Sequence, residues 1–404
     1  MTKGIGGAIP AEVLSSLTNM TSGIEPISSA EYHSRMAKAQ QLMQQQGLAA
    51  VYLNAGTNLY YFTGTRWPAS ERLVGAIIPA SGPLHYIAPA FEVATLNGFT
   101  KIKADIHCWE EHESPYQVIA TLFHSIGINN GLIGIDESTP FFVSDGLRDA
   151  LPNMQFCNGT VITAACRMEK SAAEIALMQK AKDMTLVVHQ ATASILHDNI
   201  STGEVTAFIN EAHKAVGAAS GSYFCIVLFG EDSAFPHGVA TPNPLRVNDM
   251  VLIDTGCQVE GYISDITRSY VYGEPSDRQR QIWQLEQRAQ LAAFDAAQVG
   301  ISCGAVDAAA RQLLAQAGFG PDYQLPGLPH RTGHGIGLDI HEWPYLVKGN
   351  STALAPGMCF SNEPMLCVPG EFGVRLEDHF YMTEAGPRWF TQPSTSIDDP
   401  FGIG

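Results

Sequence analysis

The stretch MVLIDTGCQVEGYISDITRSYVY, residues 250–272, predicts two apolar β-strands joined by a turn at residues 258–261. Each strand carries an aspartate, Asp254 or Asp265, at a place where a strand of this composition buries its side chains. Their spacing is consistent with facing positions on a β-hairpin. Because an ionised carboxylate is costly to bury without compensating positive charge, the stretch predicts a charged site inside the fold.

A second pair of apolar strands repeats the pattern. The segments MCFSNEPMLCVPG (358–370) and FGVRLEDHFYMTEAG (372–386) place Glu363 and Glu377 among apolar residues. The four strands contain only two arginines, which is too little positive charge for four buried carboxylates. Two divalent cations would balance them. Oxygen-rich ligands with one imidazole suit Mn²⁺, Co²⁺, Fe²⁺ or Zn²⁺.

The segment HRTGHGIGLDIHE, residues 330–342, lies between these strand pairs and concentrates polar side chains among glycines. It holds three histidines, at positions 330, 334 and 341. We expect one of them to complete a cation site as a neutral ligand.

The remaining sequence predicts two domains, with a boundary near residue 165. In the first, residues 1–165, short apolar strands alternate with helices, which indicates an α/β domain with a largely buried sheet. The second, residues 166–404, opens with Ser171 and Glu174 in a capping-box pattern before a long helix. Its order of strands and helices fits an α+β arrangement with helices packed on one face of a sheet. A helix with a glycine stop at Gly47 is expected over residues 29–47. Strands are also expected at 48–54, 73–80, 84–89 and 131–136, and helices at 116–127, 278–298 and 306–318.

The composition excludes several classes of protein. Hydrophobic residues make up 45% and charged residues 16% of the 404 residues, as in a folded globular protein. A formal charge of −17 argues against nucleic-acid binding, which needs clustered Lys and Arg. The chain shows neither a signal peptide nor a membrane span, and its eight cysteines form no C-x-x-C pair. We therefore expect a cytoplasmic protein with reduced cysteines.

Four motifs resemble, in order and spacing, those of metallopeptidase family M24, which includes prolidase, aminopeptidase P and methionine aminopeptidase. They are DTGCQVEGYISDITRSY (254–270), HRTGHGIGLDIHE (330–342), NEP (362–364) and GVRLED (373–378). The resemblance implies a pita-bread (creatinase) fold for the second domain and a smaller creatinase-like α/β fold for the first.

The resemblance also implies a set of metal ligands and a mechanism. Two divalent ions, Mn²⁺ first and Co²⁺, Zn²⁺ or Fe²⁺ as alternatives, would be held by Asp254, Asp265, His334, Glu363 and Glu377. Two close ions lower the pKa of a bridging water, and the resulting hydroxide attacks the scissile carbonyl. Glu363 would then carry the proton to the leaving nitrogen.

Other residues are expected to contact the substrate or to order the ligands. His237 and His341 resemble two histidines that contact substrate, and His341 is the first choice as donor to the oxyanion. Arg375 resembles a residue that orients the carboxylates. By contrast, His330 and His379 are expected to be ordinary polar residues near the site.

Selectivity for dipeptides is harder to place in the sequence. Larger prolidases use an arginine between the histidine motif and the NEP glutamate to hold the dipeptide carboxylate, and residues 343–362 contain none. Lys348, His237 or a partner subunit would have to replace it. Arg66 and Trp67 lie in a polar loop that in relatives approaches the partner's active site, so Trp67 is a further candidate for substrate contact.

Several functions inside the family remain as alternatives. Creatinase-type relatives lack the five ligands, and relatives that cleave dimethylsulfoniopropionate carry an acid where this chain has Gly256. Binding-only relatives usually lose metal ligands, and methionine aminopeptidase usually lacks so large a preceding domain. Aminopeptidase P and ectoine hydrolase are not excluded. The sequence therefore predicts a dinuclear Xaa-Pro dipeptidase that acts on small peptides, as a homodimer without membrane or nucleic-acid partners.

Overall fold

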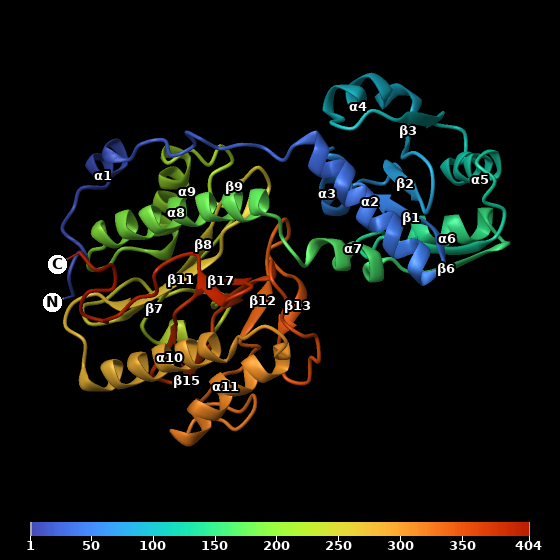
Figure 1. The fold of residues 1–404 in the computed structure, drawn as a ribbon. Helices are drawn as coiled ribbons and strands as arrows, with labels where there is room; N and C mark the ends of the chain where they lie inside the picture. Colours follow the sequence, from blue (N-terminus) through green and yellow to red (C-terminus); the bar gives the residue numbers. More distant parts are fainter. Residues whose placement is uncertain (1, 404) are drawn as a thin grey trace. The chain divides into compact units, whose positions relative to one another are not determined.

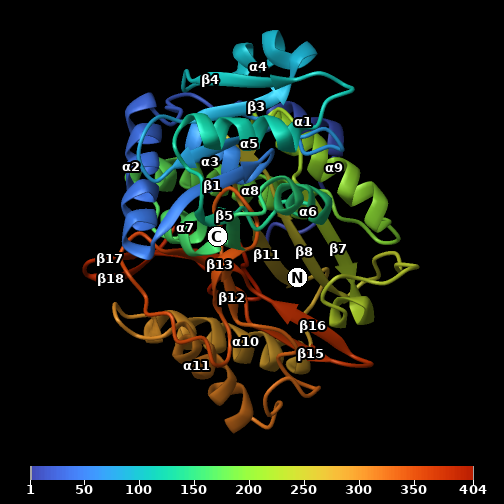
Figure 2. The same cartoon turned by 90° about the vertical axis from the view of Figure 1, so that its right-hand side faces the viewer.

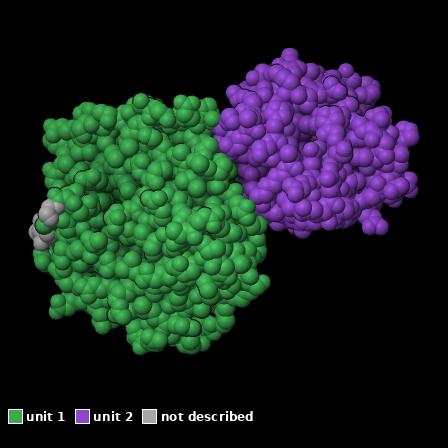
Figure 3. All heavy atoms as spheres, viewed as in Figure 1, with its two compact units in different colours: residues 1–26, 168–404 green, residues 27–167 purple. Residues whose placement is uncertain are grey.

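The computed structural model describes residues 2–403 and divides the chain into two compact units. The smaller unit comprises residues 27–167, and the larger unit comprises residues 1–26 with 168–404 (Figure 3). The observed boundary lies two residues from the predicted one. Residues 1–26, expected at the start of the first domain, belong instead to the larger unit.

Backbone hydrogen bonds explain this assignment of the amino-terminal segment. Gly6 N donates to Ala193 O at 2.9 Å, and Met20 N donates to Val216 O at 2.8 Å. The segment thus satisfies its own peptide groups on the larger unit. The sequence of this small, polar stretch carries no periodicity that would have revealed these contacts.

The smaller unit is built on one mixed sheet with the strand order β4-β3-β2-β1-β5-β6. Strand β1 pairs in antiparallel with β2 and in parallel with β5. Apolar side chains of α5 and α6, such as Phe123 and Leu147, join the buried core of the sheet. The predicted α/β organisation is therefore present. Its elements are β1 (Leu48–Asn54), β2 (Gly75–Pro79), β3 (His85–Pro89), β4 (Asp105–Trp109), β5 (Gly131–Ile135), β6 (Met154–Asn158), α2 (Ser29–Gln46), α3 (Thr57–Thr63), η1 (Ala90–Glu92), α4 (Val93–Phe99), α5 (Pro115–Ser125), α6 (Phe141–Ala150) and α7 (Thr160–Arg167).

Local signals in the sequence set the ends of two predicted helices. Helix α2 ends at Gly47, which adopts the left-handed conformation with φ 73°. Helix α8 begins with the predicted capping box, in which Ser171 and Glu174 each satisfy the other's backbone N–H. Both predictions are confirmed.

The larger unit contains a three-stranded sheet, β11-β8-β7, a five-stranded sheet, β13-β12-β14-β17-β18, and the β15-β16 and β9-β10 ribbons. Figure 1 shows α8 and α9 on one side of these strands and α10 and α11 on the other, and Figure 2 agrees. Helices therefore cover both sides, where the sequence predicted one. The elements are α1 (Pro10–Ser16), α8 (Ala172–Ser194), α9 (Thr202–Ala215), β7 (Phe224–Phe229), η2 (Gly230–Ala234), β8 (Met250–Gly256), β9 (Gln258–Val259), β10 (Tyr262–Ile263), β11 (Ile266–Val271), α10 (Asp277–Ala296), α11 (Cys303–Gln316), β12 (Gly333–Gly335), β13 (Glu342–Leu346), β14 (Cys359–Asn362), β15 (Met365–Val368), β16 (Phe372–Arg375), β17 (Asp378–Thr383) and β18 (Gly386–Trp389).

The strand register corrects one detail of the predicted site. Asp254 in β8 pairs with Thr267 of β11, so Asp265 lies diagonal to Asp254 and not opposite it. The pairing of Asn362 with Asp378 joins β14 to β17 at the ends next to Glu363 and Glu377. The acids still gather near strand ends: Asp265, Glu363 and Glu377 each lie one residue beyond a strand, and Asp254 lies two residues before the end of β8.

Two further findings concern the whole chain. Among residues 2–403, every helix is too short or too polar to cross a bilayer. The eight cysteines are free thiols.

Candidate metal centre

The two aspartates of the first strand pair lie buried close to each other. Asp254 is 6% exposed and Asp265 is 4% exposed, although both side chains are acidic. One carboxylate oxygen of each, Oδ1, is buried without a hydrogen-bond partner among the described residues. Native proteins rarely leave such atoms unsatisfied, so these two oxygens call for a ligand that the protein does not supply.

His334 and the two glutamates complete the group from the five-stranded sheet and its edges. His334 Nε2 lies 3.0 Å from Glu363 Oε1 and 3.6 Å from Asp265 Oδ2. Thr267 Oγ1 donates to Glu377 Oε2 at 2.7 Å, and His334 N donates to Ser361 Oγ at 2.9 Å. The side chain of Glu377 and the backbone of His334 are thus held before any cation binds.

Three overlapping sets of donor atoms lie close enough to hold a cation, with all distances in each set within 4.8 Å. Asp254 is outside these sets and is held by Arg375. The sets are His334 with Glu363 and Glu377, Asp265 with Glu377 and His379, and Asp265 with His334 and His341.

Electrostatics in the cluster indicate a deficit of positive charge. Burial raises the pKa of Asp254 well above its ordinary value, and the charges of Asp265 and Glu363 add to the rise. Burial and the charge of Asp265 likewise raise the pKa of Glu377. Two carboxyl groups that resist ionisation beside further acids are what a missing cation would produce.

The imidazole of His334 responds in the opposite direction. Burial lowers the pKa of His334, but the neighbouring carboxylates of Asp265 and Glu363 outweigh burial and raise it to about 9. Burial would raise the pKa of Glu363, yet His334 holds it below its ordinary value. A proton on His334 thus takes the place that a divalent cation would fill. The donor set of carboxylate oxygens and imidazole nitrogen fits a transition-metal ion of the first row.

Arg375 orders this cluster from behind. Its side chain is 3% exposed, its Nη2 binds Asp254 Oδ2, and its Nε donates to Thr267 Oγ1 at 2.9 Å. Because Thr267 in turn donates to Glu377, one guanidinium orients carboxylates from both sheets. Within the described residues these contacts place Arg375 against the acids and away from open surface.

The two histidines expected to contact substrate are both exposed. The ring centroid of His341 lies 4.2 Å from that of His334, in an edge-on arrangement. Partial desolvation where the ring packs on the cluster, followed by the charge of His334, lowers the pKa of His341 to about 4, so the ring is neutral near pH 7. His237 follows Pro236, whose carbonyl oxygen lies 3.5 Å from Arg375 Nη1.

Lys348 and Trp67 are not brought to the cluster by any contact of the described residues. Lys348 Nζ forms an ion pair with Asp322 at 2.5 Å, and its side chain is 59% exposed. Trp67 belongs to the smaller unit, where its ring packs edge-on against Phe99 at 6.2 Å. Their expected contacts with substrate stay predictions.

Two buried residues near the cluster have closer contacts than their sequence context indicates. Glu342 Oε1 lies 2.6 Å from Lys170 Nζ, in an ion pair that holds the histidine segment to the residues before α8. His379 is fully buried beside Glu377, where an ordinary polar role was expected. Its spacing of two residues from Glu377 in a strand was a signal that both face the same side.

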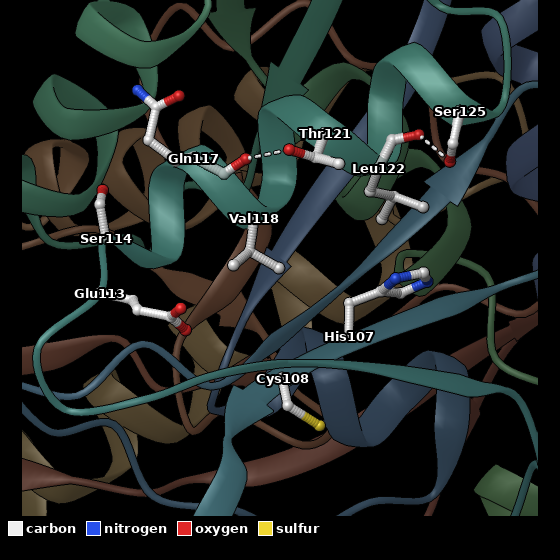
Figure 4. A pocket seen from close by; sticks show the side chains of 9 residues that line it. All are labelled: His107, Cys108, Glu113, Ser114, Gln117, Val118, Thr121, Leu122 and Ser125. Atoms are coloured by element: carbon white, nitrogen blue, oxygen red, sulfur yellow. Dashed lines mark hydrogen bonds between the residues drawn. The ribbon is translucent and has the colours of Figure 1, made fainter.

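A different hollow, of about 460 Å³, lies in the smaller unit between β4 and α5 (Figure 4). Thr121 and Ser125 turn their hydroxyl groups to carbonyl oxygens of their own helix. The lining brings together no cluster of chemical groups comparable with the acids of the larger unit. Its residues are His107, Cys108, Glu113, Ser114, Gln117, Val118, Thr121, Leu122 and Ser125.

Comparisons with known proteins agree with the two units. The model of metallopeptidase family M24 matches residues 176–384, and the model of the creatinase/prolidase N-terminal domain matches residues 35–169. The probable dipeptidase PepE of Mycobacterium tuberculosis is 35% identical over 358 residues, which are 88% of this chain and 93% of that protein. The Xaa-Pro dipeptidase of Lactobacillus helveticus is 30% identical over 363 residues, 89% and 97% of the two chains.

Solved structures give the same picture of the fold. The dipeptidase PepE from Mycobacterium ulcerans superposes with a TM-score of 0.84 at 36% identity, over 91% of this chain and 97% of that one. A recombinant prolidase from Thermococcus sibiricus superposes with a TM-score of 0.82 at 29% identity, over 90% and 98%. The predicted two-domain fold class is confirmed.

Proposed function

Because the chain belongs to metallopeptidase family M24, we propose that it is a dipeptidase that cleaves Xaa-Pro dipeptides with two divalent metal ions, Mn²⁺ foremost. The observation that carries the proposal is a cluster of three buried carboxylates and the partly buried Glu363 around His334. In it, one oxygen each of Asp254 and Asp265 has no partner among the described residues. Relatives named dipeptidase or Xaa-Pro dipeptidase support the substrate class.

The residues that would hold the ions are Asp254, Asp265, His334, Glu363 and Glu377. When bound, the ions supply Lewis acidity that polarises the scissile carbonyl and lowers the pKa of a nearby water. The protein provides preorganisation, since Arg375 and Thr267 fix carboxylates from both strand pairs before the substrate arrives.

The remaining steps belong to groups of this chain. Glu363, whose Oε1 lies 3.0 Å from His334 Nε2, would accept the proton of the attacking water. It then delivers that proton to the leaving proline nitrogen, which departs as a secondary amine. The neutral ring of His341 donates to the oxyanion that develops on the carbonyl. His237, exposed beside the cluster, contacts the dipeptide backbone or its carboxylate.

The test compares substrates on metal-depleted and reloaded protein. Initial rates are measured for Ala-Pro, Gly-Pro, Ala-Ala and Ala-Pro-Gly after chelation, and again with added Mn²⁺, Co²⁺ or Zn²⁺. We expect chelation to abolish turnover, Mn²⁺ to restore it, and the Xaa-Pro dipeptides to be preferred. Unchanged rates after chelation would refute the metal mechanism.

The other outcomes separate the alternatives. Equal or faster cleavage of Ala-Pro-Gly favours aminopeptidase P, and equal cleavage of Ala-Ala favours a general dipeptidase. Turnover of ectoine without turnover of dipeptides would favour ectoine hydrolase. Sedimentation of the same protein tests the predicted homodimer.

A further inference from the structure

His379 lies in β17 on the same side of the strand as the metal cluster. Side chains alternate along a strand, so Glu377 and His379 face one side and Asp378 the other. Asp378 is indeed bound on that other side, where Arg268 Nη2 donates to its Oδ1 at 2.7 Å. His379 is completely buried, and it thus enters the cluster beside Glu377.

The distances around the ring fit two neighbouring ligands of one ion. His379 Nε2 lies 3.4 Å from Glu377 Oε1, which is longer than the usual 2.7–3.2 Å of an N–H···O hydrogen bond. Two donors at about 2.1 Å from one ion, at angles between square and tetrahedral, are separated by about 3.0–3.4 Å. One ring nitrogen of His379 also lies within 4.8 Å of the donor atoms of Asp265 and Glu377.

The surroundings of the ring leave one of its nitrogens without a partner. His379 is completely buried, and its Nδ1 has no hydrogen-bond partner among the described residues. Native proteins rarely leave such a polar atom unsatisfied. The geometry therefore leaves the ring available to an ion.

We propose that His379 is a second imidazole ligand of the metal centre. This inference rests on the proposed pair of metal ions. The ions would then take donors from two sets, His334 with Glu363 and Glu377, and Asp265 with Glu377 and His379. Asp254, held by Arg375, would lie beside them. Two imidazoles would thus serve the two ions. Because imidazole suits Co²⁺ and Zn²⁺ more than a further carboxylate does, His379 raises the affinity of its ion for these metals.

The first experiment uses wild-type protein alone. Metal-free protein is loaded with two equivalents of Co²⁺, and X-ray absorption counts the imidazole groups around cobalt. We expect an average of one imidazole per cobalt. An average of one imidazole for every two cobalt ions, as His334 alone would give, overturns the proposal without any variant.

The second experiment measures affinity by calorimetric titration of Co²⁺ into metal-free His379→Gln. We expect one of the two binding steps to weaken at least tenfold and the other to stay within twofold. The matched control is His189→Gln, which also removes a fully buried imidazole but one bonded to the carbonyl oxygen of Ile266. Circular dichroism shows whether each variant is folded.

The outcomes separate this inference from the proposed function. If wild-type protein binds two Co²⁺ and folded His379→Gln binds both equally well, His379 is not a ligand. If wild-type protein binds no Co²⁺ at all, the proposed metal centre itself is refuted. If His189→Gln weakens the same step as much as His379→Gln, the effect is structural and the proposal is contradicted.

Discussion

At the scale of single residues, Arg375 decides how the acids of the cluster are presented. Its guanidinium binds Asp254 and donates to Thr267, which passes the constraint on to Glu377. A guanidinium can hold several acceptors in one plane, whereas an ammonium is a compact point charge. The planar geometry of the Arg375 guanidinium, and not only its charge, is therefore needed to hold the acids in place.

Replacement of Arg375 by lysine separates charge from geometry. We predict that Arg375→Lys weakens the binding of Mn²⁺ by about 10–100-fold, the range for residues that orient metal ligands. Calorimetric titration of the metal-free variant measures this loss, and circular dichroism confirms its fold. Wild-type affinity in the variant would show that charge alone is needed.

The residues of the site could be predicted because acidic side chains in apolar strands have few explanations other than a cation. Asp254, Asp265, Glu363 and Glu377 were found in this way, and the structure brings them together. His379 was undervalued because it was read as one polar residue and not as the strand neighbour of Glu377. An ion pair between residues far apart in the sequence, such as Lys170 and Glu342, cannot be predicted from the residues around either partner.

At the scale of elements, the ion pair of Lys170 and Glu342 holds the turn that presents His341. Lys170 is 1% exposed in its side chain, and its N donates to Gly357 O at 2.8 Å. Glu342 opens β13, directly after His341. A Cβ on Gly337 would lie 2.7 Å from Glu342 Oε1, so a larger residue there would displace the carboxylate from the ion pair.

A double-mutant cycle tests this ion pair. We predict that Glu342→Gln lowers the free energy of unfolding by about 3–5 kcal/mol, because it leaves the ammonium of Lys170 buried beside a neutral amide. It should also lower kcat, since His341 loses its fixed place. Lys170→Met combined with Glu342→Gln should recover part of the stability. Urea unfolding of all four proteins gives the coupling, and strictly additive losses would contradict the role of the pair.

The packing of α8 on α9 depends on a histidine that must stay neutral. Both ring nitrogens of the buried His213 face hydroxyl groups, Thr185 Oγ1 at 3.2 Å and Ser222 Oγ at 2.9 Å. Burial lowers the pKa of His213 from 6.5 to about 4. At pH values between these two pKa values, the imidazole of His213 is protonated in the unfolded chain but neutral in the folded chain.

The contribution of His213 to stability is therefore fully present above about pH 6.5 and is lost as the pH falls towards 4. By pH 5 we predict a loss of about 2 kcal/mol from this group alone, at 1.36 kcal/mol for each unit. His213→Gln should be less stable at pH 7.5 but should lose less on acidification. Urea unfolding at both pH values measures the difference, and parallel losses in the two proteins would contradict the prediction.

At the scale of the whole molecule, the order of strands and helices followed from local sequence, and the assembly of the layers did not. The capping box of α8 and the glycine end of α2 are local signals and were found. The placement of residues 1–26 on the larger unit depends on backbone bonds to Ala193 and Val216, which no local pattern encodes. Helices on both sides of the strands likewise result from long-range packing, such as Trp283 donating to Ser269 O.

The two units should respond differently to removal of metal. The smaller unit has its own apolar core, whereas the larger unit holds the acid cluster, in which burial and neighbouring acids raise the pKa of Asp254 and Glu377. A metal ion present at a hundred times its Kd stabilises the folded state by about 2.7 kcal/mol. We predict that chelation lowers hydrogen-exchange protection in β8, β11, β14 and β17 and leaves the strands of residues 27–167 unchanged.

The stabilisation of the larger unit by metal should depend on pH, and the pKa values of the buried acids determine whether it rises or falls with pH. Without cations, the raised pKa values of Asp254 and Glu377 mean that the folded chain holds protons which the unfolded chain has released. Metal-free stability therefore falls as the pH rises above the ordinary carboxyl range. A bound cation replaces those protons and also the proton of His334, whose pKa is about 9 without it. The stabilisation by Mn²⁺ should therefore be larger at pH 8 than at pH 6. Hydrogen exchange measured with and without chelator at pH 6 and pH 8 tests this prediction. If the metal increases protection equally at the two pH values, or equally in the two units, these acids do not hold the cation.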